Sequence, residues 1–433
     1  MKTLVVGLGR VGLPHALISA KNGNKVIGYD KNLNLIIELQ NRRLPFIEKD
    51  MKNLLQSTLN KSFFPKDNLN KEDWNSIEII ILTIGVDPFK KGNSFDNFWS
   101  VISSFCKLGL KGKTIVFRTT LPIGTIDKVK EFIRKRTSLN PEKDYFLGFW
   151  PERIVEGVAI KEELTLPRVV GTYSDKGFEI ISKYIKSISD APIIRVSNPK
   201  TAEFIKLLDN SYRSTMFAFS NDVAIAADNV GVDIFEALNA ANSNYPRNSI
   251  KMPSVGIGGY CLTKDPYFLE LSFPTLKRRE LKHSVWWYSR KISDEMPNYI
   301  LAKVSSILKK YNLNKVLVLG ITYKEDADDT RLSPSLYLAK SLSKEFDVSV
   351  YDPYIGKSDY VDTNGIKTES SLDKAIPGKE CVIISVKHKE FLNKGKIIRL
   401  IKTLHKPAVV IDVWGAFPWL KNKTNIIYWS FGL

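Results

Sequence analysis

The stretch VVGLGRVGLP, residues 5–14, decides the fold of the N-terminal part of this chain. Its glycines, Gly7, Gly9 and Gly12, follow a short β-branched run and precede a helical pattern. This spacing allows a tight turn after a strand, close approach of the backbone to a ligand, and a pyrophosphate seated on the helix N-terminus. We therefore predict a dinucleotide-binding βαβ unit at the start of the chain.

An acidic residue at the end of the next strand sharpens this prediction. Asp30 closes the run KVIGYD, 18 residues after Gly12. A carboxylate at this position accepts hydrogen bonds from the adenosine ribose and repels a 2′-phosphate, which favours NAD over NADP. The alternative interpretation is a structural glycine turn in an α/β domain that binds no nucleotide.

Strand-like runs alternate with helical patterns in two regions of the chain. The runs are TLVVGL, KVIGYD, IEIIILTIG, TIVFRT, DYFLGFW and PRVVGT in the first region, and KVLVLGITY, DVSVYDP, ECVIISV and AVVIDVWG in the second. Such alternation is typical of βαβ units and a parallel sheet. Between them Asn198 followed by Pro199 predicts a helix start. We predict an α/β fold of two Rossmann-like doubly wound domains, residues 1–197 and 313–433, joined by a central helical region, residues 198–312.

Composition excludes several classes of protein. With 433 residues, 43% apolar and 25% charged, the chain has ordinary globular composition. No stretch reaches about 18 consecutive apolar residues, and no leader pattern opens the chain, so neither a membrane association nor a signal peptide is expected. Three cysteines cannot form a disulfide framework, so we expect a cytoplasmic, reducing environment. Four scattered histidines argue against a metal site.

The net charge of +18 does not by itself decide the function. The lysines are spread along the chain, and no zinc-finger or RNP-like motif accompanies them. We therefore expect no nucleic-acid partner.

A glycine-rich stretch marks one cysteine as a candidate nucleophile. Cys261 lies in SVGIGGYCLTKDPYFL, and the residues that precede it include Gly256, Gly258, Gly259 and Tyr260. Glycines let a ligand come close to the backbone, while Lys264 or Asp265 can tune the protonation of the thiol. The alternative is a small buried hydrophobic residue, which is what we expect of Cys106 and Cys381.

A polar stripe runs along the helical stretch TAEFIKLLDNSYRSTMFAFSNDVA. Its members recur at intervals of three and four residues and therefore share one helix face: Glu203, Lys206, Asn210 and Arg213. The stripe either faces solvent or lines a site in which a cation and an amide stabilise an oxyanion.

Three shorter stretches also carry polar chemistry. In GFWPERIVEGVA, Glu152 and Glu156 are four residues apart and suit acid–base work. RTTLPIGT is a hydroxyl-rich turn after a strand. In GITYKEDADDTRLSP, Lys324 and Arg331 supply two cations for a second, phosphate-bearing ligand.

Together these six stretches resemble, in their order along the chain, the UDP-glucose/GDP-mannose dehydrogenase family of nucleotide-sugar dehydrogenases. The matching segments are VVGLGRVGLP, TTLPIGT, PERIVEG, AEFIKLLDNSYR, GIGGYCLTKDPY and GITYKEDADDTRLSP. The segments around Cys261 and from Lys324 to Pro334 are specific to this family. The resemblance implies an NAD-dependent, four-electron oxidation of a sugar's 6-hydroxymethyl group to a carboxylate, with two NAD⁺ consumed.

The resemblance also implies catalytic roles for matching residues. Cys261 would attack the intermediate aldehyde to give a thiohemiacetal, which is oxidised to a thioester and then hydrolysed. Lys206, with Asn210, would stabilise the developing oxyanion. Asp265 would act as a base through a water that Thr120 helps to hold.

Further roles implied by the resemblance concern hydrolysis and ligand binding. Glu152 would take part in thioester hydrolysis, and Arg247 would be lent by the neighbouring subunit of a homodimer. The implied NAD contacts are Gly7, Gly9, Arg10, Val11, Gly12, Asp30, Thr120, Glu156 and Arg331. The implied UDP-sugar contacts are Glu152, Arg153, Lys206, Asn210, Arg247, Gly256, Gly258, Gly259, Tyr323 and Lys324.

The chain departs from the family's usual pattern at four positions: Leu35, Asp87, Trp150 and Tyr260. Trp150, for example, fills a place usually held by a small or polar residue. None of the four removes a catalytic group, but together they leave the substrate open.

The substrate is the least determined property. Asp-Pro-Tyr after the cysteine, together with the RTT and PERIVEG segments, favours a UDP-N-acetylhexosamine of the mannosamine or glucosamine type. The TLP-x-G-T turn also occurs among UDP-glucose enzymes, and GDP-mannose is a third choice. Competing hypotheses are a two-electron β-hydroxyacid dehydrogenase and a non-catalytic protein that senses NAD or binds nucleic acid.

Overall fold

The computed structural model describes residues 1–86, 94–272, 282–357, 361–363, 365–423 and 425–433. Asp87, one of the departures from the family's pattern, lies outside the described residues.

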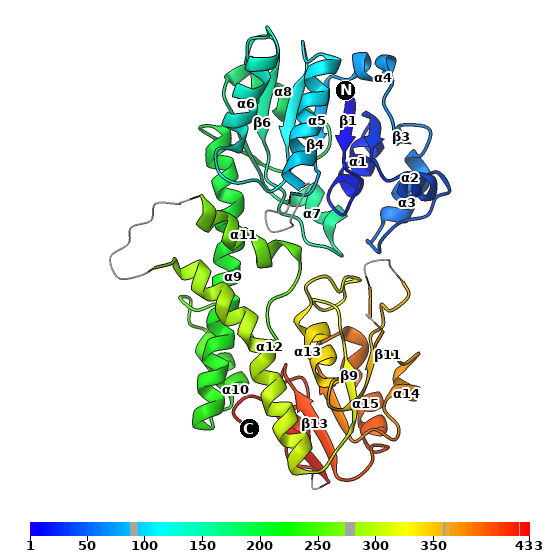
Figure 1. Cartoon of the computed structure of the whole chain (residues 1–433), viewed down its shortest axis with the longest axis vertical. Coiled ribbons are helices and arrows are strands. Elements are labelled where there is room, and N and C mark those ends of the chain that lie inside the picture. Colours follow the sequence, from blue (N-terminus) through cyan, green and yellow to red (C-terminus); the bar gives the residue numbers. More distant parts are fainter. Residues whose placement is uncertain (87–93, 273–281, 358–360, 364, 424) are drawn as a thin grey trace. The chain divides into compact units, whose positions relative to one another are not determined.

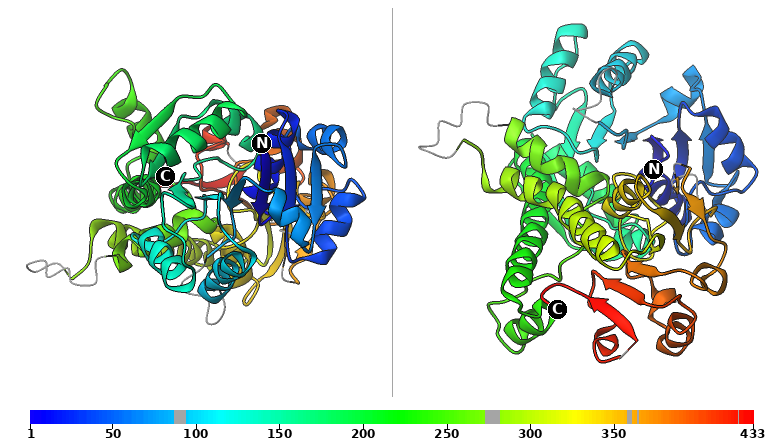
Figure 2. Two further views of the ribbon diagram at one scale, coloured as in Figure 1. Left: turned by 90° about the horizontal axis from the view of Figure 1, so that it is seen from above. Right: turned by 60° about the horizontal axis from the view of Figure 1, so that its bottom comes forward.

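The chain divides into two compact units, and their main boundary falls between Asp209 and Asn210; a short later segment that starts at Leu271 also belongs to the first unit. This boundary lies inside helix α9 (Pro199–Val230), which is continuous across it and forms a long green rod in Figure 1 and in the right-hand view of Figure 2. The helix starts as predicted, since the Asn198 side chain accepts the N–H of Thr201 at 2.9 Å. The two predicted α/β domains joined by helix are confirmed, while the predicted domain boundaries stay predictions.

The first unit is built on an eight-stranded sheet in the order β3-β2-β1-β4-β5-β6-β7-β8. Its strands are β1 (Lys2–Val6), β2 (Lys25–Tyr29), β3 (Phe63–Lys66), β4 (Ile79–Leu82), β5 (Thr114–Phe117), β6 (Phe146–Phe149), β7 (Arg168–Thr172) and β8 (Ile193–Val196). Its helices before α9 are α1 (Gly12–Lys21), α2 (Leu33–Gln40), α3 (Met51–Thr58), α4 (Lys71–Ser76), α5 (Ser94–Leu108), α6 (Thr125–Arg136), α7 (Ala159–Thr165) and α8 (Asp175–Lys186).

Neighbouring strands of this sheet are parallel except β6 and β7, which run antiparallel. The prediction of a parallel sheet therefore holds from β3 to β6 and reverses at β7. The strand order turns back between β1 and β4, and ligands bind beyond the carboxyl ends of the strands at such a point.

The second unit contains a six-stranded, fully parallel sheet in the order β11-β10-β9-β12-β13-β14. Its strands are β9 (Lys315–Leu319), β10 (Asp347–Tyr351), β11 (Lys367–Thr368), β12 (Cys381–Ile384), β13 (Ala408–Asp412) and β14 (Ile426–Trp429). Its helices are α10 (Ile234–Asn242), α11 (Tyr260–Leu271), α12 (Val285–Lys310), α13 (Pro334–Leu342), α14 (Leu372–Ala375), η1 (Lys389–Leu392), α15 (Lys394–Ile401) and η2 (Pro418–Leu420).

The strands that the sequence did not reveal are β3, β8, β11 and β14, and each lies at an edge of its sheet. An edge strand has a neighbour on one side only, so its sequence need not be a continuous apolar run. β3 contains Pro65, which an edge tolerates, and the side chains of β8 are half-buried or exposed. Central strands such as β4, with four buried side chains, carry the strong signal.

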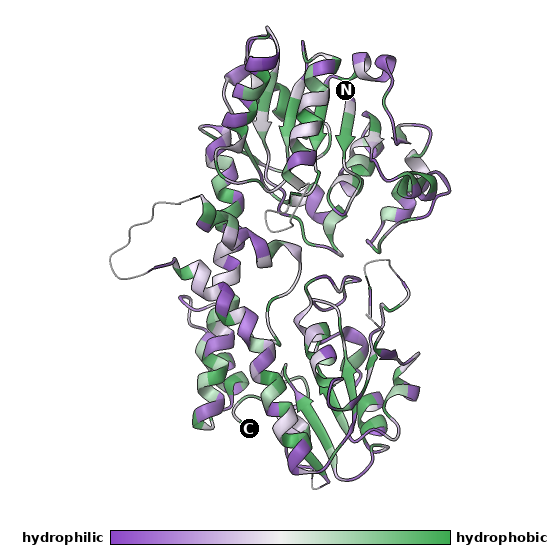
Figure 3. Ribbon diagram, in the orientation of Figure 1, coloured by the Kyte–Doolittle hydropathy of each residue, from purple (hydrophilic) through white to green (hydrophobic). Residues whose placement is uncertain are grey.

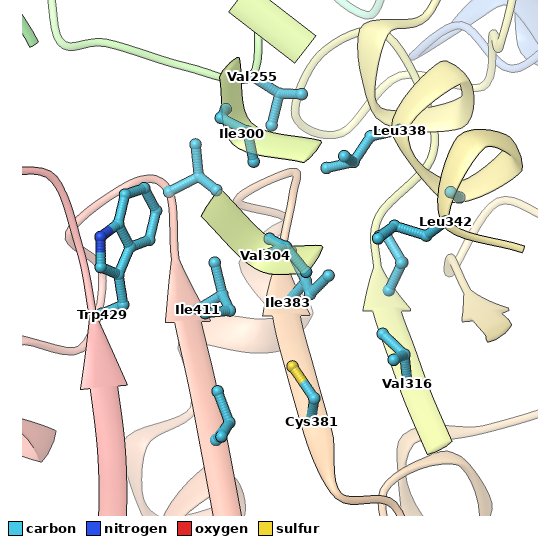
Figure 4. Packing of buried hydrophobic residues seen from close by; sticks show 14 of the residues in the cluster. Val255, Ile300, Val304, Val316, Leu338, Leu342, Cys381, Ile383, Ile411 and Trp429 are labelled. Atoms are coloured by element: carbon cyan, nitrogen blue, oxygen red, sulfur yellow. The ribbon is translucent and has the colours of Figure 1, made fainter. Parts of the chain in front are cut away.

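Apolar residues fill both faces of the second sheet. Helices α12 and α13 pack on one face, where Ile300, Val304 and Leu338 meet Val316 and Ile383 (Figure 4). Figure 3 shows the same division in both units, with hydrophobic strands inside more polar helices.

The two cysteines expected to be structural differ in burial. Cys381 lies in the core of the second sheet, as predicted, and burial raises the pKa of its thiol. Cys106 is half-buried in α5, and burial also raises the pKa of that thiol.

Candidate active site

The turn between β1 and α1 has the geometry that a dinucleotide requires. Gly7 has a φ angle of 93°, which residues other than glycine rarely adopt. A Cβ at Gly12 would overlap the carbonyl oxygen of Gly7 and lie 2.5 Å from Thr83 Oγ1. A Cβ at Gly9 would meet no atom of the described residues within 4 Å, so room remains there for a pyrophosphate. The three glycines therefore fit bound NAD.

Asp30 follows β2 and is held against this turn. Its Oδ2 accepts the backbone N–H of Leu8 at 2.8 Å, and its Oδ1 accepts that of Asn32 at 2.9 Å. The side chain is half-buried at the carboxyl end of the strand. This is where the ribose of a bound dinucleotide is recognised in such folds.

Arg10 and Glu156, both predicted to contact the cofactor, lie together in the first unit. Arg10 Nη1 is 3.6 Å from Glu156 Oε2, and its guanidinium lies 4.9 Å from the centre of the Phe46 ring. The loop that follows Glu156 is held by Glu48, which accepts two of its backbone N–H groups at 2.8 and 2.9 Å. Burial raises the pKa of Glu48. Val11 is the N-cap residue of α1.

Helix α9 brings Lys206 to the loop that carries Glu152. Lys206 Nζ donates to the main-chain carbonyl of Glu152, and both residues are buried. Glu152 Oε1 accepts the N–H of Ile154 at 2.7 Å. The adjacent Arg153 donates to a backbone carbonyl at 2.5 Å and lies 3.6 Å from Asp209. The fold thus joins two of the predicted catalytic residues.

The sequence did not predict the main ionic partner of Glu152, which is Arg118. Arg118 also donates to Glu163 at 2.6 and 3.0 Å, and its guanidinium lies 4.0 Å from the centre of the Trp150 ring. His15 completes this buried group, with Nδ1 2.5 Å from Glu163 Oε1. Arg118 and Trp150 belong to recognised segments, but nothing in the sequence indicated that Glu163 or His15 would join them.

Thr120 is half-buried in the loop between β5 and α6. That loop is tied to α9 by the buried Glu203, which accepts the N–H groups of Gly124 at 2.6 Å and Ile126 at 2.9 Å. Burial raises the pKa of Glu203 to about 7. Arg213, by contrast, is exposed. The predicted polar stripe is therefore buried at Glu203 and not at Arg213.

In the second unit, Asn210 and Asp265 meet directly. Asn210 Nδ2 donates to Asp265 Oδ2 at 2.6 Å, and both side chains are buried. Asp265 lies on α11 four residues after Cys261, which is exposed in the first turn of that helix. A helix N-terminus favours negative charge, which suits a thiolate. The ammonium group of Lys264 lies over the Tyr260 ring, 4.2 Å from its centre.

The glycines before Cys261 pack closely on the loop that follows β9. A Cβ at Gly258 would lie 2.7 Å from the Leu332 carbonyl oxygen, and one at Gly259 would lie 2.6 Å from the Tyr323 ring. Gly256 has φ of 140°. Four predicted substrate residues, the three glycines and Tyr323, are therefore brought together in the second unit.

The remaining predicted residues also lie in the second unit. Lys324 is half-buried. Arg331 donates to both carboxylate oxygens of Asp329 at 2.6–3.0 Å. Arg247 is exposed in the loop after α10 and donates to the Tyr245 hydroxyl at 2.8 Å. The expected contact of Arg331 with NAD and the exchange of Arg247 between subunits stay predictions.

Within the described ranges, no helix is both long enough and apolar enough to cross a bilayer. The same residues contain no group of three or more histidine, cysteine, aspartate or glutamate side chains arranged to hold a metal ion.

Three segments of the chain match domains of one protein family, the UDP-glucose/GDP-mannose dehydrogenase family. Residues 1–188 match its NAD-binding domain, residues 200–286 its central domain, and residues 317–418 its UDP-binding domain. These matches follow the order of the two sheets and the connecting helices.

Individual relatives cover nearly the whole chain. A UDP-N-acetyl-D-mannosamine dehydrogenase of Methanococcus vannielii is 30% identical over 435 residues, which are 99% of this chain and 94% of that protein. One of Pyrococcus horikoshii is 28% identical over 396 residues, 90% of each chain. The solved structure of a UDP-D-ManNAc dehydrogenase from Pyrococcus horikoshii superposes with a TM-score of 0.87 at 28% identity, covering 100% of this chain and 99% of that chain.

Proposed function

The chain belongs to the UDP-glucose/GDP-mannose dehydrogenase family, and from this premise we propose that it oxidises the 6-hydroxymethyl group of a UDP-N-acetylhexosamine to a carboxylate. It is an NAD-dependent UDP-sugar dehydrogenase. The relatives described above are named as dehydrogenases of UDP-N-acetyl-D-mannosamine, which supports this UDP-sugar over UDP-glucose as the substrate.

The observation that carries the proposal is the position of Cys261. Its thiol is exposed in the first turn of α11, and Asp265, one turn later, is bonded to Asn210 of α9. Residues four apart on a helix lie on the same side. A dehydrogenase that removes only two electrons needs no thiol, whereas one that continues to a carboxylate has to retain the aldehyde.

Cys261 would retain the half-oxidised sugar covalently. Its sulfur adds to the aldehyde carbon to give a thiohemiacetal. The thiohemiacetal carbon carries both a hydrogen and a hydroxyl group, so it can be oxidised a second time. Loss of that hydrogen with two electrons leaves a thioester, which water hydrolyses to the uronate and the thiol. NAD, when bound, accepts the two electrons of each oxidation, so two molecules are used per sugar.

Lys206 would stabilise negative charge on the reacting oxygen. Its Nζ donates to the main-chain carbonyl of Glu152, and this hydrogen bond holds the ammonium group in place. Asn210 holds Asp265 in one orientation, as a base that works through a water requires. Thr120 would help to hold that water.

The two ligands would be held by different units. Gly7, Gly9 and Gly12, with Asp30, would hold NAD. The glycines before Cys261, together with Tyr323 and Lys324, would hold the UDP-sugar, with the Lys324 cation opposite the diphosphate.

We also propose that the protein is a homodimer. Helix α9 exposes large apolar side chains at spacings of four and seven residues, so that they share one side: Phe204, Leu208, Tyr212 and Phe219. Such a stripe is typical of an interface between subunits. Replacing Leu208 and Phe219 together by glutamate should convert the dimer to a monomer in sedimentation velocity; an unchanged sedimentation coefficient would contradict the proposal.

The test of the activity is NADH production on UDP-ManNAc, UDP-GlcNAc, UDP-GalNAc, UDP-glucose and GDP-mannose, with the product mass recorded. Two NADH per uronate from UDP-ManNAc is the expected result. If UDP-glucose alone is turned over, the substrate proposal is wrong.

A pair of cysteine variants tests the chemistry. Cys261→Ser should release no uronate, because the thioester cannot form, whereas the matched control Cys106→Ser should keep full turnover. Complete uronate formation by Cys261→Ser would support a mechanism without the thiol.

A further inference from the structure

One arginine is shared by two buried carboxylates in the first unit. Arg118 lies just after β5, with Glu152 on one side and Glu163 of α7 on the other. Its Nη2 donates to both carboxylates, and its Nη1 donates to Glu163 at 2.6 Å. All three side chains are at most 7% exposed, so water screens these charges little.

The two carboxylates are held unequally. Glu163 receives two hydrogen bonds from Arg118, has His15 Nδ1 at 2.5 Å and lies 3.9 Å from Arg168. Glu152 has Arg118 and one backbone N–H. The larger number of donors stabilises the charge on Glu163 more than the charge on Glu152.

The direction of the pKa shifts follows this inequality. Burial raises the pKa of Glu152, and the charge of Glu163 raises it further, while Arg118 opposes both. The pKa of Glu163 is held well below its usual range, since Arg118 and His15 outweigh the effect of burial. Burial, with the charge of Arg118, lowers the pKa of His15 to about 4, so the imidazole is neutral at pH 7.

Trp150 keeps Arg118 in this position. Arg118 lies over its ring, Arg168 is 5.4 Å from the ring centre, and His15 packs edge-on at 5.5 Å. The tryptophan is fully buried. Trp150, one of the departures from the family's pattern, therefore contacts both buried arginines.

We propose that Arg118 is a positioning residue for the hydrolysis step, and that the cluster makes Glu152 the carboxylate that takes up a proton while Glu163 stays charged. This inference rests on the proposed function, because it assigns Glu152 to the thioester. Among the described residues, the charged groups that act on Glu152 are Arg118, Glu163, Lys206 and Arg168, while His15 contacts Glu163.

The step that Glu152 would assist is balanced without any oxidant. A water oxygen bonds to the thioester carbonyl carbon and gives a proton to Glu152. The carbon–sulfur bond breaks, and its electron pair returns to the Cys261 sulfur. Arg118 then faces one charged carboxylate instead of two.

The first test measures the protonation of Glu152 in the protein without substrate. The infrared carboxyl band is followed against pH and assigned by its loss in Glu152→Gln. Glu163→Gln should move the Glu152 transition about one pH unit lower, because a neighbouring negative charge is removed. Arg118→Gln should move it higher by a similar amount, because the compensating cation is lost.

Shifts of the Glu152 transition in opposite directions distinguish this role from a merely structural one. If the cluster were only structural, both variants would move the transition in the same direction. If Arg118→Gln fails to fold, Arg118→Lys keeps the charge and should leave the transition close to the wild-type pH. The matched control is Lys113→Met. Lys113 directly precedes β5, and its buried ammonium group donates to two backbone carbonyls, so its removal should leave the Glu152 transition unchanged. Shifts of equal sign in Glu163→Gln and Arg118→Gln, or no shift in Glu163→Gln, overturn the proposal.

The second test follows the reaction itself. Arg118→Gln should release NADH in a burst of about two per active site and then turn over at least tenfold more slowly, with the sugar acyl group bound to Cys261 detected by mass spectrometry. A slow burst without acylated protein contradicts the role in hydrolysis. Failure of the wild-type protein to form uronate would instead refute the proposed function. The infrared titration would still show whether Glu152 or Glu163 takes up the proton.

Discussion

The two sheets have the same order in their first six strands but use the equivalent acidic residue differently. Asp30 follows the second strand of one sheet, is half-buried and accepts two backbone N–H groups. Asp352 follows the second strand of the other and is buried. Its Oδ2 accepts the N–H groups of Ile321 and Thr322 and lies 3.0 Å from His388 Nε2.

The two units also differ in the connection that follows the first strand. In both units this connection begins with a glycine in a left-handed conformation, Gly7 with φ of 93° and Gly320 with φ of 86°. In the first unit, residues 7–11 lead directly into α1, and Gly9 leaves room beside the backbone. In the second unit, residues 320–333 intervene before α13. The strand order turns back after the first strand in both sheets, and we expect the short connection of the first unit to be the one that accepts a dinucleotide.

The largest expected effect comes from Asp352→Asn. It should lower the free energy of unfolding of the protein by about 3 kcal/mol at pH 7, since one partner of a buried pair is lost. Burial raises the pKa of Asp352, but His388 outweighs it and holds the pKa below its usual value.

A carboxyl group whose pKa is lower in the folded than in the unfolded protein stabilises the folded state at pH values above its unfolded pKa, which is about 3.9. This stabilisation is lost as the pH falls through the pKa of the folded state. The difference between wild type and Asp352→Asn should therefore be full at pH 7 and shrink below about pH 4, as measured by urea denaturation. NAD affinity serves as the control and should not change. A difference that grows on acidification would contradict this role.

The next largest effect is expected from Gly12→Ala, which breaks the cofactor turn. The added Cβ would overlap the Gly7 carbonyl oxygen, so the backbone has to move. NAD should bind about 100-fold more weakly, equivalent to about 2.7 kcal/mol, as measured by calorimetry. Binding of UDP should be unchanged, because the match to the UDP-binding domain lies in the second unit, at residues 317–418. Wild-type NAD affinity would show that the turn does not hold the cofactor.

Gly9→Ala sharpens the comparison, because its Cβ meets no described atom within 4 Å. The melting temperature should stay within a degree or so of wild type, while NAD affinity falls about tenfold, since the added methyl group would occupy the space that we expect the pyrophosphate to fill. A fall in melting temperature without a change in affinity would mean that Gly9 serves folding instead.

The smallest effect is expected from Asp30→Asn. It keeps a group that can accept the Leu8 N–H but removes the charge that we expect to repel a 2′-phosphate. The preference for NAD over NADP should fall about fivefold, as measured by the ratio of the two dissociation constants. An unchanged ratio would assign the preference to another residue.

The sequence predicted much of the fold because central strands and the glycine turn are local signals. A buried parallel strand is a continuous apolar run, and Gly7, Gly9 and Gly12 have fixed spacing. The edge strands escaped because one side of each lacks a neighbour. Cys261 and Lys206 were found because each lies in a recognisable segment.

By itself, then, the sequence determined the two α/β regions, the family and the candidate residues, since these depend on patterns over neighbouring positions. Only the tertiary structure decided which of those residues meet: Asn210 with Asp265, and Arg118 with Glu152 and Glu163. Glu163 lies 45 residues beyond Arg118, and no periodicity links them. Buried charges are paired wherever the fold brings opposite charges together, and that depends on how strands and helices pack.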